Sequence, residues 1–431
     1  MASIWLLSAL LMLLGLAGAI RDLVGAYRAS APLSFDLFAP HVAFPAAYAG
    51  LYGAGSLWLA HALGPSRVLP LYPFYFVGLL AYLGGVLVVS FLSRGRPVAD
   101  SPQRGWIPRR LALATALLFA FSATLSVWIM LRTGIPVLSP DVETSRTLIL
   151  PQVGGYVYYL ARTIAVPALL AIVYLFLRRR RLSRPARLLW LAIAALGLLA
   201  LAASGYRNGV VFVLFTAVVA YGYLVRRVRL SYAAIFVAVL LVLVAAYGLF
   251  RSLGAITWDA AAIAQRLLYE AAVVPVGLAR ILEKFPAEVD FFHGRGMALG
   301  FLALAPGEQP VLGPLLKELL GLNYAGGGFS PSILGSFYLE FGWPGVAGGM
   351  FLYGLLLAFL FQRVRRHPSE YPSLFYSFTL VYSLVAIRTG LLNDIFAVWF
   401  LVVLSAVHVY CRESPRLSLG PLLARLRGGT P

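Results

Sequence analysis

Charge is scarce in this chain, and acidic residues are the scarcest charged group. Only 12% of the 431 residues are charged, about half the share found in soluble globular proteins. Aspartate and glutamate together number 16, whereas 61% of the chain is hydrophobic. Most of the surface must therefore face lipid or other apolar helices, which excludes an ordinary soluble domain.

Several motifs of well-known chemistry are also absent. The single cysteine, Cys411, excludes an intramolecular disulfide. The sequence has no Gly-x-x-x-x-Gly-Lys-Ser/Thr loop, no His-Glu-x-x-His, no Cys-x-x-Cys and no Gly-x-Ser-x-Gly. ATP hydrolysis, a zinc site and a hydrolase serine are therefore not supported, and we expect neither a metal nor a cofactor.

The net charge of +19 would suggest nucleic acid binding in a soluble protein. Here the basic residues flank apolar runs, and cytoplasmic loops of membrane proteins are enriched in such residues. The run Arg178–Arg181 is thus interpreted as a topology anchor, and no nucleic acid partner is expected.

The apolar runs predict an all-α, polytopic membrane protein with about eleven transmembrane helices, because a spanning helix needs about 20 apolar residues. The runs lie near residues 2–20, 41–64, 71–93, 110–131, 154–177, 188–205, 209–225, 230–250, 338–361, 373–390 and 393–410. We expect residues 1–431 to form one membrane domain. No basic residue precedes Arg21, so the first run is interpreted as a span and not as a signal peptide.

Charge also predicts the orientation. With the N-terminus outside, 23 of the 35 basic residues lie in the inner loops and the C-terminal tail. The positive-inside rule favours this arrangement. We therefore expect a bacterial inner-membrane protein with its C-terminus in the cytoplasm and its active site on the periplasmic side.

Two longer segments then fall on the outer side, residues 132–153 and residues 251–337. The second is too long for a turn and too rich in apolar residues for disorder, so we expect a large, functional extracytoplasmic loop. Within it, residues 259–285 have the periodicity of an amphipathic helix, which Pro275 is expected to kink or end.

Several arginines on the outer side run against the positive-inside trend. Arginine binds phosphate through two parallel hydrogen bonds, so a lipid diphosphate would be a fitting partner. The alternative is that these arginines pair with nearby acids, as Arg266 can with Glu270 one helical turn later. The candidates for diphosphate binding are Arg146, Arg207, Arg266 and Arg280.

The segment of residues 326–345 combines flexible glycines with a helix start, at which Ser330 is expected to act as the cap. Ser330 and Tyr338 are also candidates for substrate binding. Glu340 follows at the outer mouth of a predicted span, where a carboxylate could act as a base. His293 is the alternative base. Tyr338 belongs to a set of aromatic residues that could form an interfacial belt or stack on sugar rings.

These residues give the chain a family resemblance. The stretches 134–142, with Arg146 soon after, 204–208 and 326–345 resemble the Wzy-type polymerases of O-antigen and related oligosaccharide repeat units. The resemblance implies a metal-independent glycosyltransferase of the membrane-embedded class, related to the GT-C fold. It implies that repeat units on undecaprenyl diphosphate are joined in polysaccharide and lipopolysaccharide biosynthesis. Membrane lipids and a chain-length regulator protein are the partners it suggests.

Three other functions stay open at this point. An O-antigen ligase would use the same donor with a lipid or protein acceptor, and only its product would distinguish it. A transporter of lipid-linked glycan would carry charges within its spans and often an inverted repeat, and the sequence has little of either. A scaffold in envelope assembly would tolerate the loss of the outer arginines.

Overall fold

The computed structural model describes residues 1–28, 36–93, 105–139, 141–178, 181–205, 207–226, 228, 230–253, 259–302, 311–324 and 327–412. Over these residues the chain is helical, apart from one isolated bridge between Trp106 and Arg412. The predicted all-α class is confirmed for this part of the chain.

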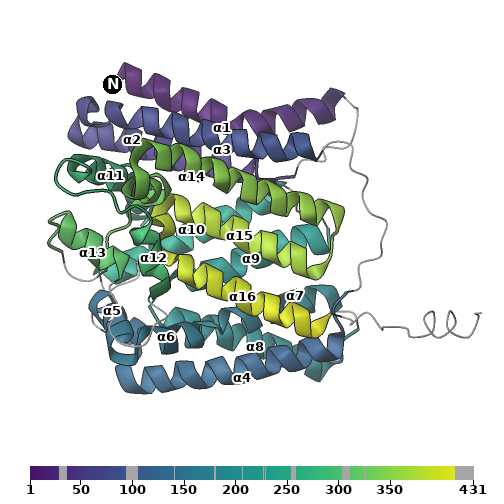
Figure 1. The fold of residues 1–431 in the computed structure, drawn as a ribbon. Helices are drawn as coiled ribbons and strands as arrows, with labels where there is room; N and C mark the ends of the chain where they lie inside the picture. Colours follow the sequence, from purple (N-terminus) through teal and green to yellow (C-terminus); the bar gives the residue numbers. More distant parts are fainter. Residues whose placement is uncertain are drawn as a thin grey trace, which may run out of the picture.

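The elements of the first half of the chain are all helical (Figure 1). They are α1 (Ala2–Arg28), α2 (Ala43–Leu63), η1 (Pro65–Arg67), η2 (Leu69–Leu71), α3 (Tyr72–Leu92), α4 (Pro108–Thr133), η3 (Pro136–Leu138), α5 (Val142–Val153), α6 (Gly155–Arg162), α7 (Ala165–Arg178) and α8 (Arg184–Ala203).

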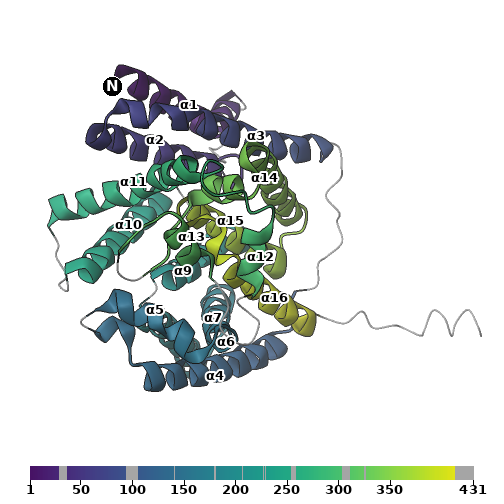
Figure 2. The same ribbon diagram turned by 60° about the vertical axis from the view of Figure 1, so that its left-hand side comes forward.

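The second half contains the longest helix, of 35 residues, and two α-helices of eight residues each. Its elements are α9 (Arg207–Leu224), α10 (Leu230–Leu253), α11 (Ala260–Lys284), α12 (Arg295–Leu302), α13 (Leu312–Leu319), α14 (Ser332–Arg366), α15 (Glu370–Thr389), η4 (Gly390–Asn393) and α16 (Asp394–Cys411). Turning the molecule shows α10 and α11 extending together from one side of the bundle (Figure 2).

Among the described residues, eight helices are long and apolar enough to cross a membrane. They are Ala2–Val24, Pro65–Leu92, Pro108–Thr133, Gly155–Arg178, Arg184–Ala203, Leu230–Phe250, Ala260–Lys284 and Ser332–Arg366. Helical backbone satisfies its own hydrogen bonds, which lipid requires of any spanning segment. The chain is therefore a multi-pass membrane protein, as predicted.

The number of spans differs from the predicted eleven, although every predicted run is helical. Helices α9 and α16 are apolar but shorter than a full crossing, and α2 and α15 are not among the eight candidates. Conversely, α11 is a candidate span, although the sequence placed it in an extracytoplasmic loop. Its amphipathic pattern led to that interpretation, yet 25 residues of sufficient hydropathy also fit a crossing.

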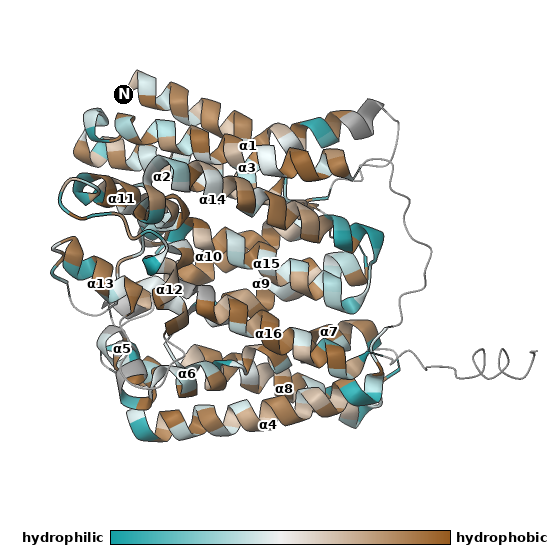
Figure 3. Cartoon of the chain, in the orientation of Figure 1, coloured by the Kyte–Doolittle hydropathy of each residue, from teal (hydrophilic) through white to brown (hydrophobic). Residues whose placement is uncertain are grey.

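Hydrophilic residues gather at both ends of the bundle, whereas the helices are mostly hydrophobic along their middle (Figure 3). At one end α14 meets α3, where Arg366 Nη2 donates to the Ser93 carbonyl at 3.3 Å, and α4 meets α16, where Ile107 N donates to the Cys411 carbonyl at 2.9 Å. We call this the basic end; it carries Arg21, Arg109, Arg110, Arg178, Arg363, Arg365, Arg366 and Arg412. The opposite end, with α5, α12 and α13, is called the loop end (Figure 1).

The centre of the bundle depends on close contact between α3 and α14. A Cβ at Gly85 would lie 2.2 Å from the Phe351 carbonyl oxygen, and one at Gly354 would lie 2.1 Å from that of Tyr82. Small residues let membrane helices approach in this way. The outward faces of α1 and α4 instead expose large apolar side chains such as Leu6 (71%) and Leu131 (82%), as expected for contact with lipid.

Candidate functional site at the loop end

Helix α14 is not one straight span but a hairpin. Phe341 (φ −143°) and Gly342 (φ 63°, ψ −140°) interrupt its helical backbone. The Phe337 and Tyr353 rings lie 6.4 Å apart, whereas sixteen residues of straight helix would span about 24 Å. A Cβ at Gly345 would lie 2.2 Å from the Phe337 carbonyl oxygen. Residues 332–340 therefore fold back on residues 343–353. We call this reversal the α14 hairpin, and residues 332–340 are its first arm.

The hairpin begins differently from the sequence prediction. Helix α14 starts at Ser332, with Pro331 before it and no side-chain cap, so the predicted capping role of Ser330 is wrong. The Ser330 carbonyl instead packs against α11, where a Cβ at Gly277 would lie 2.7 Å from it. Ser332 has a φ of 63°, and its Oγ accepts hydrogen bonds from the Tyr52 hydroxyl at 3.1 Å and from Gly335 N at 3.3 Å.

Glu340 ends the first arm of the hairpin and is 2% exposed. Its carboxylate accepts hydrogen bonds from Gly294 N at 2.6 Å and from Met297 N at 2.8 Å, at the start of α12. A carboxylate at a helix N-terminus pairs with free N–H groups and with the positive end of the helix dipole. A Cβ at Gly296 would lie 2.3 Å from this carboxylate, so a glycine is required there.

His293 lies directly beside Glu340, and its side chain is exposed. Its backbone has a φ of 51°, and its N–H donates to the Glu340 carbonyl at 3.0 Å. The imidazole lies 6.0 Å from the Phe341 ring and 6.4 Å from the Phe291 ring. The structure thus brings together the two residues that the sequence offered as alternative bases, and only the imidazole is open to solvent.

Tyr338 lies within an aromatic cluster. Its ring meets Phe74 and Phe291 edge to face, each at 5.5 Å, and its hydroxyl donates to the Phe285 carbonyl at 3.4 Å. With 7% of its surface exposed, this ring packs inside the protein. Trp343 stacks on Phe74 at 3.7 Å and stays 42% exposed, so it presents the larger open aromatic surface.

Arg266 belongs to an ion-pair cluster between α11 and α15. One oxygen of the Glu270 carboxylate lies 3.0 Å from Arg266 Nη2, and the other oxygen lies 2.6 Å from Arg388 Nη2. Glu270 is 8% exposed, and the Arg266 guanidinium also lies 5.1 Å from the Tyr269 ring. Two cations therefore converge on one buried carboxylate, which we call the Arg266–Glu270–Arg388 cluster.

Sequence reasoning missed Arg388. It lies in the last turn of α15, next to η4, at the outer end of the predicted span 373–390. A cation at the outer end of an apolar run runs against the positive-inside trend, which is the signal that could have identified it.

Arg280 does not join this cluster. Helix α11 continues through Pro275 to Lys284, so it does not end at the proline, which was one of the two expected outcomes. Proline leaves the Ala271 carbonyl without its helical partner, and that carbonyl lies against α2, where a Cβ at Gly55 would be only 2.4 Å away. Arg280 thus lies about 21 Å along the helix from Arg266. It is exposed and pairs with Glu283 at 3.0 Å.

The structure brings the segments around Arg146 and Arg207 together. Gly205, with a φ of 75°, lies in the turn between α8 and α9. A Cβ there would lie 3.3 Å from the Arg146 Cβ and 3.4 Å from the Pro136 Cβ. Arg207 is the first residue of α9, and its side chain lies outside the described residues, so its contacts stay untested.

Asp141 fixes the start of α5, five residues after η3 begins. Its carboxylate accepts a hydrogen bond from Thr144 N at 3.0 Å, and the hydrogen bonds from Thr144 lower the pKa of this carboxyl. Helix α5 then presents Arg146 one turn later. Next to it, the Arg162 guanidinium donates to the Tyr158 hydroxyl at 2.8 Å and lies 4.6 Å from the Phe396 ring on α16.

Over the described residues, no group of three or more His, Cys, Asp or Glu side chains is arranged to bind a metal ion. The charged groups brought together at the loop end are mainly guanidinium groups, which bind phosphate and carboxylate.

Comparison with known proteins identifies the family. Residues 71–401 match the family model described as "Putative O-antigen polymerase". No curated protein and no solved structure matches the chain. The matched range includes all three sequence stretches, the α14 hairpin and the Arg266–Glu270–Arg388 cluster, and it covers most of the chain. The chain therefore belongs to the O-antigen polymerase family.

Proposed function

We propose that this protein joins oligosaccharide repeat units carried on undecaprenyl diphosphate into a longer lipid-linked glycan, and that Arg266 and Arg388 bind the donor diphosphate. The observation that supports this is the convergence of two guanidinium groups on the buried Glu270 carboxylate, at 3.0 and 2.6 Å. A site that pairs two arginines with a carboxylate has the charge and geometry to bind a diphosphate.

Glu270 then acts as an internal anion. It keeps the two guanidinium groups together when no donor is bound, and the incoming diphosphate competes with it for them. Arg146 on α5 and Arg207 at the start of α9 lie at the loop end and are proposed to assist in diphosphate binding. Arg280, about 21 Å along α11 and paired with Glu283, would contact only a distant part of the substrate.

His293 is the proposed general base, and Glu340 is proposed to position it. The Glu340 carboxylate is buried and already accepts two backbone hydrogen bonds, so it is not open to a sugar hydroxyl. The exposed imidazole of His293 is free to reach a sugar hydroxyl. Trp343, exposed on the same hairpin as Glu340, offers a face for stacking on a sugar ring, whereas Tyr338 and Ser330 are proposed to support the site through packing.

The reaction is a displacement at the anomeric carbon. A hydroxyl oxygen of the acceptor unit forms a bond to this carbon, and its proton moves to His293. The bond between the anomeric carbon and the diphosphate oxygen breaks, and the electron pair leaves with the diphosphate. Arginines stabilise the charge that develops on the leaving group. The growing glycan thereby moves onto the incoming lipid-linked unit without a metal.

The site would face the periplasm, because the basic end of the bundle is expected to lie in the cytoplasm of a bacterial inner-membrane protein. The helical architecture and the lipid-linked donor agree with a membrane glycosyltransferase of the GT-C type. A chain-length regulator protein would be a further partner.

Reconstitution tests the proposal. The full-length protein is placed in liposomes with lipid-linked repeat units from its own host, and the products are separated by size. We expect a ladder of lipid-linked glycans, which Arg388→Ala abolishes and Arg280→Ala leaves intact. A single transfer to another acceptor would instead support a ligase, and transbilayer movement of the glycan without any product would support a transporter.

A further inference from the structure

A second site lies at the basic end of the bundle, away from the loop end. A cavity of about 600 Å³ opens there between α1, α3 and α14. Arg21, Arg365 and Arg366 line it, together with His41. Three arginines around one cavity repel one another unless an anion or solvent compensates their charge.

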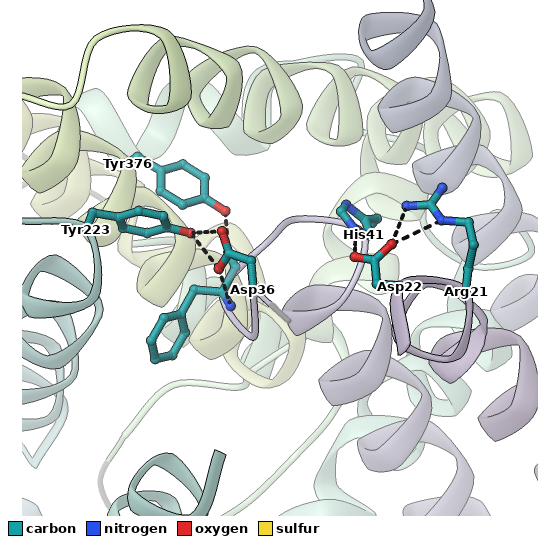
Figure 4. A network of polar contacts seen from close by, with 7 residues as sticks. Arg21, Asp22, Asp36, His41, Tyr223 and Tyr376 are labelled. Atoms are coloured by element: carbon teal, nitrogen blue, oxygen red, sulfur yellow. Dashed lines mark hydrogen bonds and ion pairs between the residues drawn. The ribbon is translucent and has the colours of Figure 1, made fainter. Parts of the chain in front are cut away.

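The acidic groups near this cavity do not balance the three arginines. Asp22 pairs with Arg21 at 2.9 Å and with His41 at 2.7 Å, so one carboxylate already serves two basic groups (Figure 4). Asp36, on the same connection as His41, accepts a hydrogen bond from the Tyr223 hydroxyl at 3.2 Å. The described acids around the cavity thus leave its basic lining with an excess of positive charge.

The geometry of α14 directs two of the arginines to the cavity. Arg366 is tied to the cavity wall, since its Nη2 donates to the Ser93 carbonyl at the end of α3. Arg365 extends its guanidinium over the Phe361 ring at 5.8 Å and is exposed.

On α1, Gly18 allows close contact with the connection to α2, because a Cβ at this glycine would lie 2.0 Å from the His41 carbonyl oxygen. Arg21, one turn later, is thereby placed at the rim.

The opposite wall of the cavity is apolar. Leu83, Val86 and Leu87 of α3 and Ala358 of α14 line it, and the polar residues between them are Ser90, Ser93 and Gln362. Leu87 is 59% exposed and lies on a helix that crosses the membrane by length and composition. The cavity therefore combines a basic rim at the end of the helices with an apolar wall that runs along them.

We propose that this cavity binds one anionic phospholipid, with its phosphate between Arg21, Arg365 and Arg366 and its acyl chains along α3. Basic pockets between membrane helices recognise anionic headgroups by this chemistry. Arginine also suits the phosphate geometry, because its planar fork donates two parallel hydrogen bonds. The bound lipid bridges α1 and α14.

Native mass spectrometry of the full-length protein tests the proposal. The protein is titrated with phosphatidylglycerol and, separately, with phosphatidylcholine, and retained lipid is counted. We expect retention of phosphatidylglycerol over phosphatidylcholine. Arg365→Gln should weaken retention roughly fivefold, and the double change with Arg366→Gln roughly 25-fold, because a basic residue near a lipid surface contributes about 1 kcal/mol.

The matched control is Arg363→Gln, which removes an exposed arginine from the same turn of α14 that does not line the cavity. It should retain phosphatidylglycerol as the unchanged protein does, and equal elution volumes in gel filtration would show that all variants are folded. Equal retention by the double variant, or equal retention of the two lipids, would overturn the proposal. Displacement of the lipid by millimolar glycerol phosphate would show that the apolar wall plays no part, and would overturn the assignment to a phospholipid.

Discussion

Replacing Glu270 by Gln should weaken the fold and strengthen diphosphate binding at the same time. The side chains of Glu270, Arg266 and Arg388 are 10%, 22% and 29% exposed. Removing one partner of a fully buried ion pair costs about 3–5 kcal/mol, whereas an exposed pair contributes at most about 1 kcal/mol. The partial exposure of the two guanidinium groups places the expected loss of stability between these limits, at about 2–3 kcal/mol.

The gain in binding follows from the same geometry. In the unchanged protein a diphosphate must displace the Glu270 carboxylate from both guanidinium groups. The amide of glutamine competes far less, because hydrogen bonds between charged groups are roughly twice as strong as neutral ones. We expect affinity for a diphosphate to rise at least about tenfold, which corresponds to about 1.4 kcal/mol.

Thermal unfolding of the purified protein, with and without a short-chain isoprenyl diphosphate, measures both effects. A bound ligand raises the unfolding midpoint according to its concentration relative to Kd. The variant should start lower and gain more from the ligand than the unchanged protein does. Glu283→Gln is the control, because it removes an exposed acid from the same helix, paired with Arg280 at 3.0 Å. It should change stability by less than about 0.5 kcal/mol.

The reasoning would be refuted by a Glu270→Gln variant as stable as Glu283→Gln, with unchanged diphosphate affinity. Loss of stability without any gain in affinity would show that the ion-pair cluster stabilises the fold, and would refute its proposed role in diphosphate binding.

Three further predictions concern the loop end. His293→Ala should lower polymer synthesis about 100-fold or more with normal protein levels, measured as the rate of ladder formation. Arg280→Ala should leave that rate within twofold and change stability by about 0.5 kcal/mol or less, since the side chain is exposed. Gly345→Leu should disrupt the α14 hairpin and lower the unfolding temperature, because a Cβ there would lie 2.2 Å from the Phe337 carbonyl oxygen. The control Gly348→Ala has open space around its Cβ and should unfold at the same temperature as the unchanged protein.

The sequence predicted the helices well because their signal is local. Long apolar runs form helices in lipid whatever their neighbours are, since no other open structure satisfies the backbone there. The bounds of α11, Ala260–Lys284, agree with the predicted helix of residues 259–285 because Asp259 caps its first turn, accepting from Ala261 N and Ala262 N. The path of α11 across the bundle depends on α2 and α14, and that information is not local.

The candidate site was predicted as a set of residue types but not as an arrangement. Glu340 stood out as an acid in an apolar setting, yet its hydrogen-bond partners, Gly294 and Met297, are more than forty residues away in sequence. The reversal at Gly342 was likewise hidden, because a single glycine within an apolar stretch does not distinguish a packed helix from a turn. Only the contact of Phe337 with Gly345 and Tyr353 reveals the hairpin.

The α14 hairpin also explains how two distant parts of the site can be positioned by one short element. Ser336 Oγ accepts a hydrogen bond from Leu391 N at 3.0 Å, and Gly390 packs against the same hydroxyl, where a Cβ would lie 2.3 Å away. This contact fixes Gly390, directly after α15 and two residues beyond Arg388. One turn further along the hairpin, about 6 Å away, Glu340 fixes the backbone that carries His293. The proposed leaving-group site and the proposed base therefore depend on the same nine residues, so a shift of the hairpin would move both together, and a change at Ser336 should impair catalysis without touching the substrate.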